Sequence, residues 1–213
     1  MNLLFDLDGT LTDPYLGISR CIAHAMEHVE TPLPDGSDCR AFIGPPLQQT
    51  FLTLCGDTEK AAAALTAYRD RFAAIGLYEN ELYPGIPEML ASLGDHPLFV
   101  CTSKPTAYAT RIVEHFGLAR YFVAVYGSEL DGTRADKGDL VAWILETEGL
   151  GPENCLMVGD RIHDIVGAAK NGVPALGVLW GYGRVDEFAE AGPQATIDRP
   201  EDLEPWLRGT YLA

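Results

Sequence analysis

Short apolar runs alternate along the chain with segments in which apolar residues recur every three or four positions. The short runs predict buried strands, and the longer spacing predicts amphipathic helices. Strands of a parallel sheet are covered on both faces, so they read as continuous apolar runs. The five predicted strands are NLLF (2–5), LFVCT (98–102), YFVAVYG (121–127), CLMVG (155–159) and PALGVL (174–179).

Helices are predicted between these strands by periodicity and by their end signals. Pro87 lies near the first turn of the segment 86–93, and Gly94 follows its end. Gly117 ends a second predicted helix. The segments 138–149 and 164–172 are also predicted helices, and each ends at a glycine. Strands that alternate with helices predict an α/β fold with a parallel sheet and helices on both faces.

One region interrupts the alternation, because only helical signals are found between about Pro14 and Leu82. An all-helical block inserted after the first strand predicts a separate cap at 15–81, with an α/β core at 1–14 and 82–213. The expected hinges are residues 13–15 and 81–85. A lid over the carboxyl ends of the strands would close where such folds bind ligands.

Polar residues follow three of the predicted strands directly, and one lysine begins the helix before the fourth strand. In a parallel sheet the carboxyl ends of the strands share one edge. Burying carboxylates there without partners is costly, which points to a metal ion or a reaction. The residues expected to meet at this edge are Asp6, Asp8, Thr102, Ser103, Lys104, Lys137, Asp160 and Asp164.

Four motifs at this edge carry a resemblance to a known family. They are DLDGTLTD, VCTSKP, Lys137 and VGDRIHD, in this order along the chain. The chain resembles haloacid dehalogenase (HAD) superfamily phosphatases over essentially its whole length, in particular the phosphoglycolate-phosphatase-like subgroup with a helical C1-type cap. The resemblance implies a Rossmann-like, doubly wound sheet in the order 5-4-1-2-3, with strands numbered along the chain.

Chemical roles follow from the resemblance and from the chemistry of phosphoryl transfer. Asp6 is the expected nucleophile, which forms an aspartyl-phosphate, and Asp8 the expected general acid and base. Thr102 and Lys137 would hold the phosphoryl oxygens. Further phosphate contacts are expected from backbone N–H groups at Gly9 and from Ser103 and Lys104.

Several carboxylates repel a phosphate dianion, so a hard cation is expected as cofactor. Mg²⁺ suits oxygen ligands and retains some of its waters. The expected ligands are the Asp6 carboxylate, the Asp8 backbone carbonyl and Asp160, with Asp164 acting through a water.

The composition of the chain excludes some classes of binding partner. The chain has 31 acidic and 15 basic residues, a formal net charge of -16, which argues against nucleic-acid polymers and anionic membrane surfaces. The five cysteines form no C-x-x-C pair and favour a reducing, cytoplasmic location. The apolar run before Asp6 is too short for a signal peptide, and no stretch reaches membrane-spanning length. A monomer or a small homo-oligomer is expected.

The resemblance implies a small phosphate ester as substrate, and it favours phosphoglycolate. Its carboxylate would need a cation from the cap, for which Arg40 and Arg69 are the first candidates. A 5'-nucleotidase is the alternative, and it would need a stacking surface such as Tyr15 or Phe42. A β-phosphoglucomutase-like phosphotransferase also stays open, because it shares the paired aspartates and a helical cap.

Overall fold

A computed structural model of the chain describes residues 1–34 and 36–211. The chain forms two compact units, one made of Met1–Thr12 with the chain from Leu82 onward and the other of Asp13–Glu81. The strands β2 (Thr12–Asp13) and β3 (Glu81–Leu82) pair with each other where the chain passes between the units. The first unit is α/β and the second is helical, and the role of the second as a cap stays a prediction.

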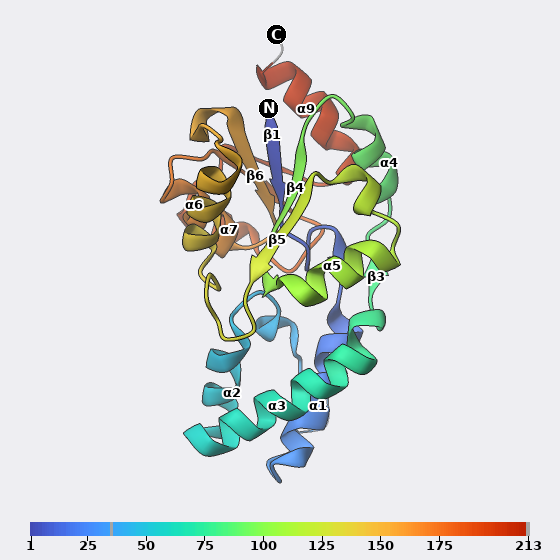
Figure 1. Cartoon of the computed structure of the whole chain (residues 1–213), viewed down its shortest axis with the longest axis vertical. Helices are drawn as coiled ribbons and strands as arrows, with labels where there is room; N and C mark the ends of the chain where they lie inside the picture. The colour runs from blue at the N-terminus through green and yellow to red at the C-terminus, as the bar shows by residue number, and fades with distance from the viewer. Residues whose placement is uncertain (35, 212–213) are drawn as a thin grey trace. The chain divides into compact units, whose positions relative to one another are not determined.

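The α/β unit contains a six-stranded sheet whose pairings are all parallel (Figure 1). The predicted fold class is therefore confirmed. The five predicted strands follow the order 5-4-1-2-3, but a sixth strand that was not predicted, β8, extends the edge beyond β7. The strands are β1 (Asn2–Phe5), β4 (Leu98–Pro105), β5 (Ala124–Ser128), β6 (Cys155–Gly159), β7 (Ala175–Val178) and β8 (Ala195–Ile197).

Helices cover both faces of this sheet, with α6 and α7 on one side and α5 on the other (Figure 1). The helices of the unit are α4 (Ile86–Ser92), α5 (Thr106–His115), α6 (Lys137–Glu148), α7 (Ile162–Ala169), α8 (Val185–Ala191) and α9 (Leu203–Tyr211), with 3-10 turns η3 (Ala119–Tyr121), η4 (Pro152–Asn154) and η5 (Pro200–Asp202). The η3 turn explains why β5 begins at Ala124 and not at Tyr121, where the sequence predicted it.

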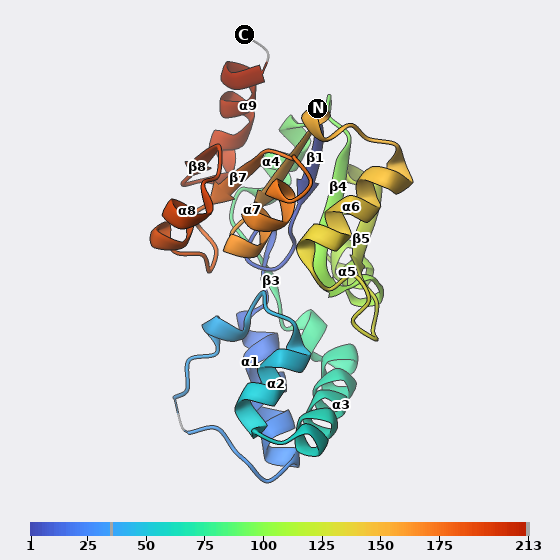
Figure 2. The same cartoon turned by 90° about the vertical axis from the view of Figure 1, so that its left-hand side faces the viewer.

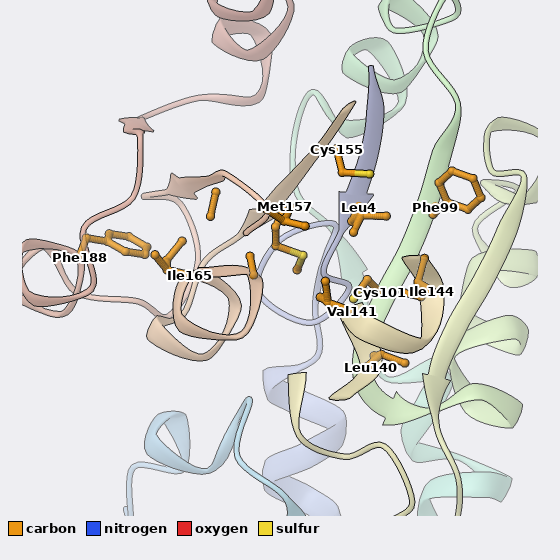
Figure 3. Packing of buried hydrophobic residues seen from close by; sticks show 13 residues of the cluster. Leu4, Phe99, Cys101, Leu140, Val141, Ile144, Cys155, Met157, Ile165 and Phe188 are labelled. Carbon is orange, nitrogen blue, oxygen red and sulfur yellow. The ribbon is translucent and has the colours of Figure 1, made fainter. Parts of the chain in front are cut away.

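A buried apolar cluster joins the sheet to α6, α7 and α8 (Figure 3). Leu4 from β1 and Met157 from β6 are fully buried, as is Val141 from α6. Removing such side chains from water is the main force that fixes the helices on the sheet. The polar strand ends are therefore attached to a rigid, close-packed base.

The helical unit consists of α1 (Tyr15–His28), α2 (Leu47–Cys55) and α3 (Thr58–Ala74), with 3-10 turns η1 (Arg40–Phe42) and η2 (Gly76–Tyr78) (Figure 2). Phe51 of α2 packs edge-on against Tyr68 of α3 at 5.8 Å between ring centroids. Glu79 ties two helices together, because its carboxylate accepts from Arg20 of α1 at 2.7 Å and from Arg71 of α3 at 2.8 Å. Among the helices of the described residues, none has the length and apolar character that a membrane span requires.

Candidate active site

Strand register brings the polar residues of the α/β unit together. In the central strand β1, Phe5 lies opposite Val100 of β4 on one side and Val158 of β6 on the other. The next positions of the three strands therefore reach the same edge of the sheet, where Asp6 follows β1 and Asp160 follows β6. The sequence prediction of a shared edge agrees with this register.

Three aspartates form a buried acidic cluster at this edge. Carboxylate oxygens of Asp6, Asp160 and Asp164 lie within 4.8 Å of one another. Asp164 belongs to the first turn of α7, where its side chain also accepts from the Arg161 N–H at 3.0 Å. Burial raises the pKa of Asp164 to about 6, although Lys137 acts in the opposite direction.

Lys137 lies between two of these carboxylates. Its Nζ is 3.0 Å from Asp6 Oδ1 and 2.8 Å from Asp164 Oδ1, and it donates to the Cys101 carbonyl at 2.8 Å. Burial alone would disfavour its charge, but Asp164 and Asp6 outweigh burial and raise its pKa. Lys137 is therefore a buried ammonium whose charge is favoured by two aspartates, and these aspartates explain its position at the start of α6.

Asp8 and Lys104 form a second pair. Lys104 Nζ lies 2.6 Å from Asp8 Oδ2, and both side chains are largely buried. Asp8 Oδ1 is buried and has no hydrogen-bond partner among the described residues. Burial raises the pKa of Asp8, against the opposing charge of Lys104. The structure pairs Lys104 with Asp8, and its predicted contact with a phosphate stays a prediction.

Other predicted phosphate contacts have partners within the α/β unit. Thr102 is buried, and its hydroxyl accepts from the Lys104 N–H at 3.3 Å. The Ser103 carbonyl accepts from the Ser128 hydroxyl at 2.8 Å. The Gly9 N–H donates to the Thr12 carbonyl at 2.8 Å, so this amide has a partner in its own loop, and the phosphate contacts predicted for the backbone after Asp8 stay a prediction. The contribution of Gly9 is conformational, because its φ of +87° is unfavourable for other residues.

The donor set fits a hard divalent cation. It consists of carboxylate oxygens, and the cluster collects more negative charge than Lys137 offsets. Oxygen ligands in this number suit Mg²⁺. The carboxylates of Asp6, Asp160 and Asp164 would hold it, and the predicted contribution of the Asp8 carbonyl stays a prediction.

The predicted substrate residues Arg40 and Arg69 belong to the helical unit, in η1 and α3. Arg40 is exposed, pairs with Asp38 at 3.2 Å and lies over the ring of Tyr15 at 5.0 Å. Arg69 is half-buried. Their roles toward a substrate stay predictions.

Sequence reasoning missed the groups that hold Asp160. Its Oδ1 accepts from the Thr10 hydroxyl at 3.2 Å, and its Oδ2 accepts from the Tyr182 N–H at 2.8 Å. Thr10 stands in the first motif without a role assigned from the sequence. Two glycines, Gly181 and Gly183, shortly after the strand predicted at 174–179, are the signal that would have marked the second segment.

Comparison with known proteins agrees with this geometry. The parallel α/β sheet brings four aspartates and two lysines together at one edge. This site and the chain's relatives together identify the class of protein as a hydrolase that acts on phosphate monoesters. The chain belongs to the haloacid dehalogenase-like hydrolase family, whose model matches residues 3–178. The resemblance seen in the sequence is thus confirmed.

Individual relatives differ in their activities. The chain is 49% identical over 195 residues to a 5'-nucleotidase of Pseudomonas aeruginosa, covering 90% of this chain and 88% of that protein. It is 42% identical over 186 residues to the tyrosine-protein kinase PtkA of Mycobacterium tuberculosis, covering 86% of this chain and 64% of the kinase. Phosphoglycolate phosphatases of Vibrio and Agrobacterium species match at 26% to 30% identity. The crystal structure of a predicted phosphatase from Clostridium acetobutylicum superposes with a TM-score of 0.92 at 38% identity, and the match covers 98% of each chain.

Proposed function

We propose that this protein is a magnesium-dependent phosphate monoesterase that works through an aspartyl-phosphate on Asp6. The observation that carries the proposal is the buried cluster of Asp6, Asp160 and Asp164 around Lys137. The Leu7 N–H, at 2.8 Å, and the Lys137 ammonium, at 3.0 Å, both contact Oδ1 of Asp6. Its Oδ2 therefore has neither of these contacts, and the carboxylate is held in a fixed orientation.

The proposed reaction proceeds in two steps. In the first, an oxygen of Asp6 forms a bond to phosphorus, the ester oxygen leaves, and Asp8 gives that oxygen a proton. In the second, Asp8 takes a proton from a water as the water attacks phosphorus, and Asp6 is released with inorganic phosphate. Lys137 holds Asp6 in place throughout and offsets its charge. What Mg²⁺ supplies when bound is neutralisation of the phosphate oxygens.

Asp8 has the environment that this role needs. Burial raises its pKa, and a carboxyl group that is protonated nearer neutral pH is a better proton donor. Lys104, at 2.6 Å, fixes one oxygen of the carboxyl group. The other oxygen is without a partner among the described residues and is the one available for the proton transfer.

Nucleoside 5'-monophosphates are the first candidates for the substrate, and phosphoglycolate is the second. The relative at 49% identity over most of the chain is a 5'-nucleotidase, whereas the phosphoglycolate phosphatases match at 30% or less. Three arginines of the helical unit also have acidic partners, since Arg20 and Arg71 bind Glu79 and Arg40 binds Asp38. A substrate carboxylate would have to compete with these partners, while a base needs only an aromatic surface.

A panel of phosphate monoesters with Mg²⁺ tests this order. We expect kcat/KM for nucleoside monophosphates to exceed that for phosphoglycolate at least tenfold, a difference of about 1.4 kcal/mol in transition-state binding. The assay measures free phosphate, so a phosphotransferase that passes the group to a second sugar or to a protein would give a low yield on every substrate. A tenfold preference for phosphoglycolate would reverse the order and leave the catalytic residues unchanged.

The metal proposal makes a prediction that needs no substrate. Mg²⁺ binds the folded cluster and not the unfolded chain, so Tm should rise steadily with the logarithm of Mg²⁺ concentration above Kd, by the equivalent of about 2.7 kcal/mol at 100 times Kd. Asp160→Asn should remove most of this rise. The exposed Asp95→Asn is the matched control and should keep it. An unchanged Tm in wild-type protein up to tens of millimolar Mg²⁺ would contradict the site.

A further inference from the structure

The segment after β7 lies against the acidic cluster, although it contributes no side chain to it. The Trp180–Gly183 segment reads WGYG. The indole N–H of Trp180 donates to the Thr10 carbonyl at 2.9 Å, and the Tyr182 N–H donates to Asp160 Oδ2 at 2.8 Å. The segment therefore contacts both the loop that follows β1 and the aspartate that follows β6.

Two glycines allow this close approach. A Cβ on Gly181 would lie 2.2 Å from the Gly9 carbonyl oxygen and 2.5 Å from Asp160 Cβ. A Cβ on Gly183 would lie 1.6 Å from the Asp160 carbonyl oxygen. Atoms that are not bonded to each other do not approach this closely. Any side chain at these positions would therefore push the segment away from Asp160.

Asp160 is held differently from the other two members of the cluster. Asp6 and Asp164 share the ammonium of Lys137, whereas Asp160, within residues 1–34 and 36–211, forms hydrogen bonds but no ion pair. Each of its two oxygens accepts from one neutral donor, Thr10 on Oδ1 and Tyr182 on Oδ2. Thr10 is in turn held through its carbonyl by Trp180. The orientation of this fully buried carboxylate therefore depends on the Trp180–Gly183 segment from both sides.

We infer that the Trp180–Gly183 segment positions Asp160 for the metal ion, with Trp180 acting through Thr10. The inference rests on the proposed magnesium site and adds a part of the chain to which no role was assigned from the sequence. Groups that hydrogen-bond to metal ligands fix their orientation, and losing one typically weakens metal affinity about 10- to 100-fold. Trp180 is a positioning residue, because its indole N–H donates to a loop carbonyl and not to a carboxylate of the cluster.

Trp180→Phe tests the inference, because phenylalanine keeps most of the apolar contact and removes the N–H donor. The measurement is the Mg²⁺ concentration that produces a fixed rise in Tm, with the Mg²⁺ dependence of phosphate release as a second readout. We expect this concentration to rise about tenfold or more in Trp180→Phe. Trp206→Phe is the matched control, since Trp206 is also half-buried and lies in α9 against Tyr211; it should keep the wild-type value.

The results distinguish failure of the positioning role of Trp180 from failure of the proposed magnesium site. A Trp180→Phe protein with lower stability without Mg²⁺ but wild-type Mg²⁺ affinity would make Trp180 a packing residue only and overturn the inference. Wild-type protein that shows no binding of Mg²⁺ would overturn the proposed function and the inference with it. Should Trp180→Phe fail to fold, Thr10→Val, which removes the donor to Asp160 Oδ1 with little change of shape, decides instead: an unchanged Mg²⁺ affinity would overturn the inference.

Discussion

Replacing Asp6 by asparagine is expected to reduce phosphate release at least about a thousandfold, because loss of a nucleophile removes the covalent route altogether. Asparagine keeps the shape of the side chain and still accepts from the Leu7 N–H, which lies 2.8 Å from Oδ1. The amide is not able to attack phosphorus. The measurement is single-turnover and steady-state phosphate release with Mg²⁺ on the best substrate of the panel.

Two controls make the Asp6→Asn result specific. Circular dichroism and Tm should show a folded protein, and Asp95→Asn, an exposed change of the same chemistry, should keep wild-type turnover. No phosphate label should be trapped on the Asp6→Asn chain after acid quenching, whereas wild type should show it. Turnover at a tenth of wild type or above would remove Asp6 from the nucleophile's role.

Lys137→Met is expected to lower both stability and activity. The ammonium donates to the Cys101 carbonyl, forms ion pairs with Asp6 and Asp164, and is almost fully buried. Removing one partner of a buried pair leaves the others uncompensated and costs about 3 to 5 kcal/mol. Turnover should fall at least about a hundredfold, since Asp6 loses its fixed orientation and the phosphate loses a positive charge.

The control for Lys137→Met is another lysine near the same helix. Lys170 pairs with Asp136 at 3.3 Å in an exposed position, and an exposed pair contributes about 0 to 1 kcal/mol. Lys170→Met should therefore leave turnover unchanged and Tm nearly so. Chemical denaturation compares the two variants, and equal losses of stability would contradict the buried role of Lys137.

The sheet was predictable where a strand contains an unbroken run of apolar residues. β1 and β6 gave unbroken runs, and the residues directly after them are the polar ones, so the meeting of Asp6 with Asp160 followed from parallel topology alone. β8 was missed because it has three residues with a threonine in the middle, too short for any period. The true start of β5 was missed because the apolar run begins at Tyr121, the last residue of η3, three positions before the strand begins at Ala124.

Side-chain pairing was less predictable than strand position. The register between β4 and β5 shifts between Thr102 and Pro105, and no sequence rule shows to which side such a bulge turns Lys104. The pairing of Lys104 with Asp8 therefore appeared only in three dimensions. Arg20 with Glu79 and Trp180 with Thr10 are contacts across 59 and 170 positions, which local patterns do not contain.

The insertion of the helical unit after β1 has a consequence for synthesis of the chain. β1 is the central strand, and its partners begin at Leu98 and Cys155. At translation rates of about 5 to 20 residues per second, the first partner emerges roughly 5 to 20 s after β1. All of residues 13–81 leaves the ribosome in that interval, so the helical unit is complete while NLLF is still unpaired. The strand that leads into Asp6 is thus made before both of its partners and stays unpaired until they emerge.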